Sequence, residues 1–142
     1  HFWAAPYERG DEFGGLGWPA PLPADTLAMR VKGDLPANTT IAIVATDAEL
    51  TKAQAKRLAV MAHDGMARAL RPAHAALDGD LVFAGATACA SLAPAIRDLT
   101  EIGLSAADCL ARAIARAIYE ASALPFAGAL PAWRDVFGVR RP

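Results

Sequence analysis

The chain has 142 residues, a formal net charge of −1 at pH 7, 54% hydrophobic residues and 20% charged residues. This length suits one domain, and the apolar content excludes a disordered chain. The balance of charge argues against a protein that binds nucleic acid or a membrane surface through bulk electrostatics.

The first part of the chain, residues 1–38, is interrupted throughout by glycine and proline. Such spacing is typical of an extended arm with little regular structure. We therefore divide the chain into this arm, 1–38, and a regular unit, 39–142. We expect the arm to lie against another surface, which a second polypeptide could provide, because it carries four large aromatic residues that need burial: Trp3, Tyr7, Phe13 and Trp18.

The regular unit begins with a strand and a helix. Residues 39–45 are apolar and rich in β-branched side chains, which favours a strand buried on both faces. Thr51 and Gln54 have the spacing of a capping box and predict a helix over residues 52–70. Pro72 ends that helix because proline cannot continue it.

A second strand and further helices follow. Residues 77–80 are a turn signal, and residues 81–88 are typical of a strand. A short helix is predicted over 97–101 and ends at Gly103, after which Ser105 caps another, largely buried helix. The alternation of strands and helices predicts an α/β fold. Four charged residues of the last helix recur at intervals of four and predict one solvated stripe: Asp108, Arg112, Arg116 and Glu120.

The first candidate for a catalytic role is Thr39, at the junction between the arm and the first strand. A threonine there can reflect β-propensity alone. If the chain is cut directly before it, Thr39 gains a general base of its own, because the free α-amine titrates close to neutral pH and can accept the hydroxyl proton. An N-terminal threonine is a known variant of the serine–base arrangement.

The second candidate is the acidic pair Asp78 and Asp80 before the second strand. Two carboxylates at this spacing can hold or polarise a nucleophile, or they can be two exposed acids of a turn. The further ligands of a calcium loop do not follow. His63 and His74 lack the HExxH spacing of zinc sites, so they are weak candidates, and we expect neither a metal nor another cofactor.

The two cysteines and the apolar runs bear on the cell compartment. Cys89 and Cys109 do not form a CxxC pair, and we expect them to be buried free thiols in a reducing compartment. The longest uncharged run is shorter than a membrane-spanning helix, and no signal peptide is evident at the start. We therefore expect a cytoplasmic protein.

Several segments, taken together, form a recognisable pattern. Asn38-Thr39-Thr40 leads into the first strand, and Asp78-Gly79-Asp80 precedes Val82-Phe83-Ala84. With these segments and those that follow, the chain resembles the L-aminopeptidase/D-esterase family, which includes the β-peptidyl aminopeptidases and the nylon-oligomer hydrolases. The resemblance covers the chain from Asn38 onward and, more loosely, the arm around Phe13-Gly14-Gly15. The further matching segments are 50–59, 61–65, Arg71-Pro72 with His74, and 130–138.

The resemblance implies a fold and a set of roles. The fold is a four-layer αββα sandwich of the DmpA type, to which this chain contributes a part. The precursor cuts itself, with Asn38–Thr39 as the scissile bond and Thr39 as the nucleophile. Residues 1–38 then form the end of the large subunit, and residues 39–142 the small subunit. Asp78 and Asp80 occupy the positions that contact and orient the nucleophile in the nylon-hydrolase branch.

The resemblance also implies a partner. The lysine, the oxyanion-stabilising asparagine and the amine-binding pocket of the family's large subunit have no counterpart in this chain, which begins at His1 without an initiator methionine. We expect it to need the rest of the large subunit and to hydrolyse nothing alone. Processed heterodimers are expected to form a homo-oligomer that acts on peptides or amino amides in the bacterial cytoplasm and binds neither nucleic acid nor membrane.

Two functions of different classes remain open. The leading one is an autoprocessing N-terminal-nucleophile aminopeptidase or amidohydrolase that cleaves N-terminal aminoacyl amides or esters through Thr39. The alternative is a non-catalytic assembly or binding domain of the same fold. The missing part of the large subunit and the aromatic arm favour this alternative.

Overall fold

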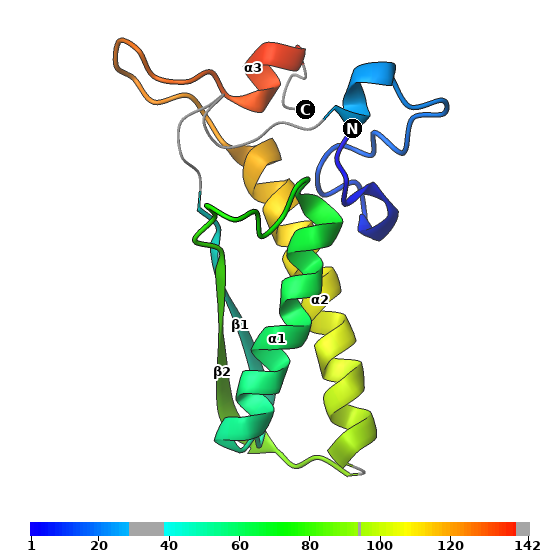
Figure 1. The fold of residues 1–142 in the computed structure, drawn as a ribbon, viewed down its shortest axis with the longest axis vertical. Coiled ribbons are helices and arrows are strands. Elements are labelled where there is room, and N and C mark those ends of the chain that lie inside the picture. Colours follow the sequence, from blue (N-terminus) through cyan, green and yellow to red (C-terminus); the bar gives the residue numbers. More distant parts are fainter. Residues whose placement is uncertain (29–38, 94, 139–142) are drawn as a thin grey trace.

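The computed structural model describes residues 1–28, 39–93 and 95–138. Within these residues the fold is a mixed α/β structure in which two long helices lie side by side on one face of a two-stranded parallel sheet (Figure 1). The arm contains two short 3-10 helices, Ala5–Tyr7 and Ala24–Leu27. The other elements, in chain order, are β1 (Ile41–Ala48), α1 (Lys52–Ala69), β2 (Leu81–Ala90), α2 (Ala95–Glu120) and α3 (Trp133–Phe137).

The sheet pairs β1 with β2 in parallel, and α1 forms the crossover between the two strands. Ile41 lies opposite Leu81, and the register continues along the strands as far as an irregularity after Thr46. Side chains alternate between the two faces of a strand. Val82 is therefore buried under the helices, whereas Ile43 on the other face is 72% exposed. The expectation of a strand buried on both faces is wrong for the described chain, because both long helices lie on the same side.

The first turn of α1 confirms the predicted capping box. The Thr51 hydroxyl accepts a hydrogen bond from the Gln54 N–H at 3.3 Å, and the Gln54 side-chain oxygen accepts one from the Thr51 N–H at 2.8 Å. Each bond satisfies an N–H group that the helix itself leaves unpaired. The helix ends at Ala69, three residues before Pro72, close to the predicted boundary.

The second long helix, α2, is one continuous helix of 26 residues, where the sequence predicted two separate helices. The expected break at Gly103 and the expected cap at Ser105 do not occur. Gly103 is buried and faces Met61 of α1, where a Cβ atom would collide with the thioether end of the methionine. This glycine permits a close approach of two helices, and it does not end one.

The expected solvated stripe on this helix is found only in part, because Arg116 and Glu120 are exposed whereas Asp108 and Arg112 are half-buried. Asp108 forms an ion pair with Arg68 of α1, and Glu120 forms one with Arg134 of α3 at 3.1 Å. Arg112 donates to both carboxylate oxygens of Glu12 in the arm, at 2.5 and 2.9 Å. The hydrogen bond from Arg112 holds the pKa of Glu12 below its ordinary value. Charges at this spacing therefore tie α2 to its neighbours.

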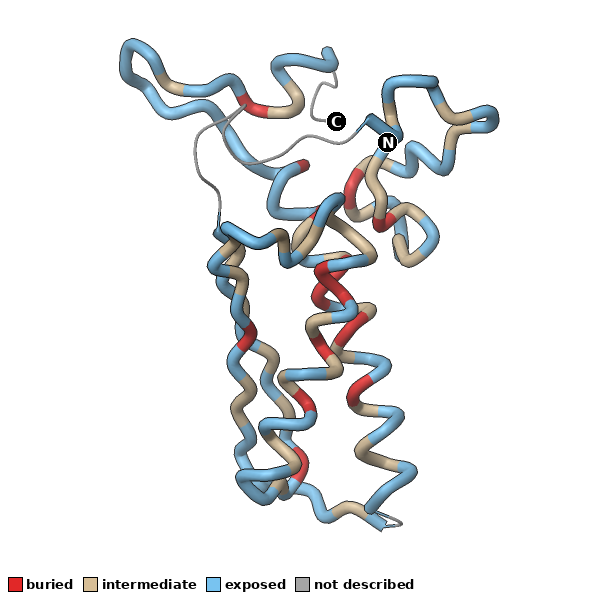
Figure 2. Tube along the Cα trace, in the orientation of Figure 1, coloured by how far each residue is buried: buried red, intermediate tan, exposed pale blue. Residues whose placement is uncertain are grey.

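The arm packs on the chain's own α2. Phe13, with 1% of its surface exposed, and Ala4 form a buried cluster with Ala111, Ala115 and Tyr119. Figure 2 shows buried residues in the arm and along the facing sides of α1 and α2. For residues 1–28, the prediction that the arm lies against another surface is confirmed around Phe13, and the chain's own helix provides that surface, whereas Trp18 is 43% exposed.

Two further observations concern the surface. Cys89 and Cys109 are free thiols as expected, but both are exposed, so the expected burial is wrong. Cys109 lies on the side of α2 that faces away from the cluster around Phe13. Within the part of the chain that the structure describes, no helix is long and apolar enough to cross a membrane.

Candidate active site

The candidate residues meet where β1 and β2 begin. Thr39 is exposed and Thr40 is half-buried, directly before β1. Because Ile41 lies opposite Leu81 in a parallel pair, the residues that precede the two strands share one edge of the sheet (Figure 1). This brings Thr40 to Asp80 across 40 positions of sequence. Asn38, the other half of the expected scissile bond, lies outside the described residues.

Asp80 connects the segments at this edge of the sheet through hydrogen bonds. Its Oδ1 accepts a hydrogen bond from the Thr40 N–H at 2.9 Å, and its Oδ2 accepts one from the His74 N–H at 3.2 Å. The carbonyl oxygen of Thr40 in turn accepts a hydrogen bond from the Leu81 N–H at 2.9 Å. Only 6% of the Asp80 side chain is exposed. The carboxylate is therefore held at both oxygens, and it fixes the residue that follows Thr39.

The surroundings of Asp80 keep it ionised. Burial is the largest single influence and raises its pKa. The backbone hydrogen bonds from Thr40 and His74, the charge of His74 and a hydrogen bond from the Thr40 side chain together outweigh burial, so the pKa of Asp80 is lower than its ordinary value. At neutral pH Asp80 is thus a carboxylate that accepts hydrogen bonds and has no proton to donate.

Asp78 has a different place in the same turn. Its Oδ2 accepts a hydrogen bond from the Ala75 N–H at 2.9 Å, and its own N–H donates to the carbonyl oxygen of Ala75 at 2.8 Å. Asp78 therefore braces the turn that leads to Gly79. The two acids that the sequence presents as a pair have separate structural tasks.

Gly79 sets how closely this turn approaches Thr39. A Cβ atom at position 79 would lie 3.2 Å from the Thr39 Oγ1 and 3.3 Å from its Cγ2. Such distances are tighter than an ordinary van der Waals contact, so a Cβ atom at position 79 would displace the side chain of Thr39 by a few tenths of an ångström. Sequence reasoning presented Asp78-Gly79-Asp80 as a turn and missed this steric role.

The two histidines extend the cluster. His74 has a φ of +55°, in the left-handed region, and its Nδ1 lies 3.5 Å from Oδ2 of Asp80. Its Nε2 lies 3.2 Å from Nδ1 of His63 on α1. Their spacing fits no metal motif, so the sequence made them weak candidates. The signal that could have found them is that His74 shares a turn with Asp80. Among the described residues, no group of three or more potential ligands is arranged to hold a metal ion.

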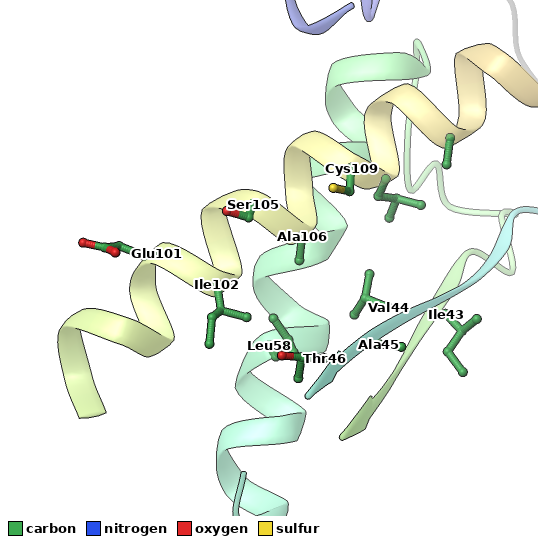
Figure 3. Close-up of a pocket in the computed structure, with 12 residues that line it drawn as sticks. Ile43, Val44, Ala45, Thr46, Leu58, Glu101, Ile102, Ser105, Ala106 and Cys109 are labelled. Carbon is green, nitrogen blue, oxygen red and sulfur yellow. The ribbon is translucent and has the colours of Figure 1, made fainter. Parts of the chain in front are cut away.

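A separate cleft of about 580 Å³ lies between β1 and α2 (Figure 3). Its walls are mostly apolar, with Glu101, Ser105 and Cys109 as polar groups on the helix. The strand contributes residues 43–46 to this cleft, whereas Thr39 precedes the strand. The cleft and the cluster around Thr39 are therefore distinct features.

The comparison with known families places the chain among the peptidases. The model of peptidase family S58 matches residues 8–129, which include the arm from Glu8, the Thr39 segment and the Asp80 turn. The chain belongs to peptidase family S58.

Curated relatives from mycobacteria agree with this family. An uncharacterized aminopeptidase of Mycobacterium bovis is 46% identical over 112 residues, which are 72% of this chain and 32% of the relative. An uncharacterized aminopeptidase of Mycobacterium tuberculosis strain H37Rv gives the same values. One of Mycobacterium leprae is 46% identical over 97 residues, 61% of this chain and 27% of the relative. The chain thus spans about a third of the length of the curated relatives it matches.

Proposed function

We propose that this chain is the part of an autoprocessing N-terminal-nucleophile aminopeptidase or amidohydrolase that carries the nucleophile, Thr39. The observation that supports this most is the packing of the exposed Thr39 side chain against Gly79, beside the buried carboxylate of Asp80. Asp80 binds the N–H of Thr40, so the chain is held directly after Thr39 while Thr39 remains open to a substrate. Family membership and the aminopeptidase names of the relatives support a peptidase activity.

In the proposed reaction, cleavage of the Asn38–Thr39 bond first frees the α-amine of Thr39. The Thr39 Oγ1 attacks the carbonyl carbon of an N-terminal aminoacyl amide or ester, and the α-amine accepts the hydroxyl proton. The amine then gives this proton to the leaving amine or alcohol as the C–N or C–O bond breaks, and an acyl group remains on Thr39. Water, deprotonated by the same amine, attacks the acyl carbonyl carbon. The amine returns this proton to Oγ1 as the ester bond breaks, and the amino acid leaves. In this proposal Asp80 orients the nucleophile through the N–H of Thr40, Asp78 does so through the turn that carries Gly79, and these steps require no metal or cofactor.

The remainder of the proposed enzyme is a larger partner from the same precursor. The sheet face that carries Ile41, Ile43 and Phe83 is exposed and apolar, which suits a second sheet layer in a four-layer αββα sandwich. Donors that stabilise the oxyanion belong to that partner in this proposal, and loss of one such donor costs about 10²–10³ in rate. We therefore propose that residues 1–142 alone hydrolyse nothing, and that the processed heterodimers form a cytoplasmic homo-oligomer.

The processing step tests the proposal directly. The complete polypeptide that carries this chain is purified, its intact mass is measured, and its N-terminal residues are sequenced. We expect two products, of which the downstream one begins at Thr39. A single uncut chain, or a product that begins at another residue, contradicts the proposal and favours the non-catalytic assembly domain.

Gly79 offers a test of the geometry around Thr39. We expect Gly79→Ala to push the Thr39 side chain by a few tenths of an ångström, because the new Cβ atom would lie 3.2 Å from the Thr39 Oγ1. A misplacement of about 1 Å can cost about 10²-fold in rate, so turnover of an aminoacyl anilide should fall about tenfold.

The matched control for this substitution is Gly85→Ala in β2, where a Cβ atom would have no neighbour within 4 Å. We expect this variant to keep the activity of the unmodified enzyme. The thermal unfolding midpoint, Tm, should be similar in both variants. Equal turnover in Gly79→Ala and Gly85→Ala contradicts the steric role of Gly79.

A further inference from the structure

Three side chains form a continuous line of contacts from the helix α1 to the start of β1. Nδ1 of His63 lies 3.2 Å from Nε2 of His74, and Nδ1 of His74 lies 3.5 Å from Oδ2 of Asp80. Oδ1 of Asp80 accepts the Thr40 N–H at 2.9 Å. The line thus ends at the residue that follows Thr39, and its exposure falls along the way, from 40% for the His74 side chain to 6% for that of Asp80.

The chemistry of these groups indicates which atom is the donor and which is the acceptor at each contact. Asp80 is ionised and only accepts hydrogen bonds, so the nitrogen of His74 that faces it, Nδ1, carries a proton. In a neutral His74 with its proton on Nδ1, Nε2 accepts from Nδ1 of His63; in a charged His74 both ring nitrogens are donors and Nδ1 still faces Asp80 with a proton. A proton on Nδ1 of His63 favours the neutral tautomer in which His74 presents a proton to Asp80.

The backbone of His74 adopts an unusual conformation that suits this arrangement. Its φ of +55° lies in the left-handed region, which carries an energetic cost for residues other than glycine. Glycine at this position would remove that cost. The left-handed backbone directs the N–H and the ring Nδ1 of the same residue to one oxygen, Oδ2 of Asp80.

We propose that His74 is a positioning residue, whose ring, oriented by His63, holds the carboxylate of Asp80 against the N–H of Thr40 and so aligns Thr39 for its reaction. The inference rests on the proposed function, because the group that it aligns is the proposed nucleophile. His74 touches neither Thr39 nor the substrate in this scheme, and it acts through Asp80.

His74→Gly separates positioning from folding. This variant keeps the backbone N–H bond to Asp80, relieves the left-handed backbone and removes only the ring. In the complete, processed polypeptide we expect kcat for an aminoacyl anilide to fall about tenfold, as for the loss of one hydrogen bond to a charged group. KM should stay the same and Tm should be equal or higher. His74→Asn, which tolerates the left-handed region and offers an N–H donor, should recover part of kcat.

Four further variants complete the experiment. Ala88→Gly places glycine at a residue of β2 that also has a positive φ, +57°, and should leave kcat unchanged. His63→Ala should lower kcat by a few-fold, whereas Lys56→Ala, seven residues earlier on α1 and exposed, should not. Thr39→Ala reports on the proposed function itself.

The outcomes distinguish the inference from the function on which it rests. An unchanged kcat in His74→Gly, with turnover lost in Thr39→Ala, overturns the inference alone. A fall in kcat that is matched by a fall in Tm, and that His74→Asn does not recover, also overturns it, because that result describes a structural residue. Turnover retained in Thr39→Ala overturns the proposed function and the inference together.

Discussion

Thr39→Ala should leave the complete polypeptide uncut and should lower its turnover of aminoacyl anilides by about 10³-fold or more, the scale on which removal of a nucleophile acts in hydrolases. The side chain of Thr39 is exposed and makes its close approach at Gly79, so its removal leaves no buried group without a partner. We therefore expect the same Tm in the variant and in the uncut wild-type precursor. Intact mass reports the cut, and initial rates report the turnover.

Two neighbouring variants make this result specific. Thr39→Ser keeps the hydroxyl group and should still be cut. Thr40→Ala should also be cut, because the N–H and the carbonyl oxygen of Thr40 hold it to Asp80 and Leu81 through the backbone. Its lost hydroxyl contact with Asp80 should cost only a few-fold in rate. Efficient cutting of Thr39→Ala would contradict the assignment of the nucleophile.

Local sequence signals predicted the elements that local physics determines. The capping box at Thr51 and the proline after α1 act within one turn of helix, and both ends of α1 lie close to the predicted residues. Gly103 misled the prediction because its effect depends on Met61, which the chain brings to it from another helix. In isolation a glycine weakens a helix by about 1 kcal/mol; at a close helix contact it is the residue that fits.

The charges of α2 show the same limit. A spacing of four residues says that side chains share one face of a helix, and it does not say what lies opposite that face. Glu12 lies 100 positions before Arg112, and its carboxylate is nevertheless the partner of that guanidinium. The exposed state of Cys109 is a further result of tertiary arrangement, since the cleft beside β1 opens next to it.

For the candidate site, the sequence predicted that Thr39 and the 78–80 turn would come together, and parallel pairing of the two strands is the physical reason. The unequal tasks of Asp78 and Asp80 depend on backbone N–H groups, which no residue pattern records. His74 was underestimated for a similar reason: its left-handed backbone and the approach of His63 from α1 are both tertiary features.

Gly65→Ala should destabilise the protein strongly, because at this glycine the backbone of α2 approaches α1 closely. A Cβ atom at position 65 would collide with the carbonyl oxygen of Ala107 and would lie 2.9 Å from the Cβ of Leu110. Both atoms belong to the rigid frame of α2, so the helices must move apart. Overpacking of this kind costs about 1–3 kcal/mol, occasionally more, and it exceeds the gain of about 1 kcal/mol in helix propensity.

Gly103→Ala provides the matched comparison at the same interface. Its new Cβ atom would meet the thioether end of Met61, which is flexible and can adopt another rotamer. The gain in helix propensity then offsets most of the cost, and we expect its Tm to stay close to that of the wild type. In the same polypeptide, Gly65→Ala should lower Tm by several degrees. Equal Tm values in the two variants would contradict this explanation. The rigid backbone at Ala107 would then not be the cause of destabilisation, and the contact at Gly65 would be looser than its distances indicate.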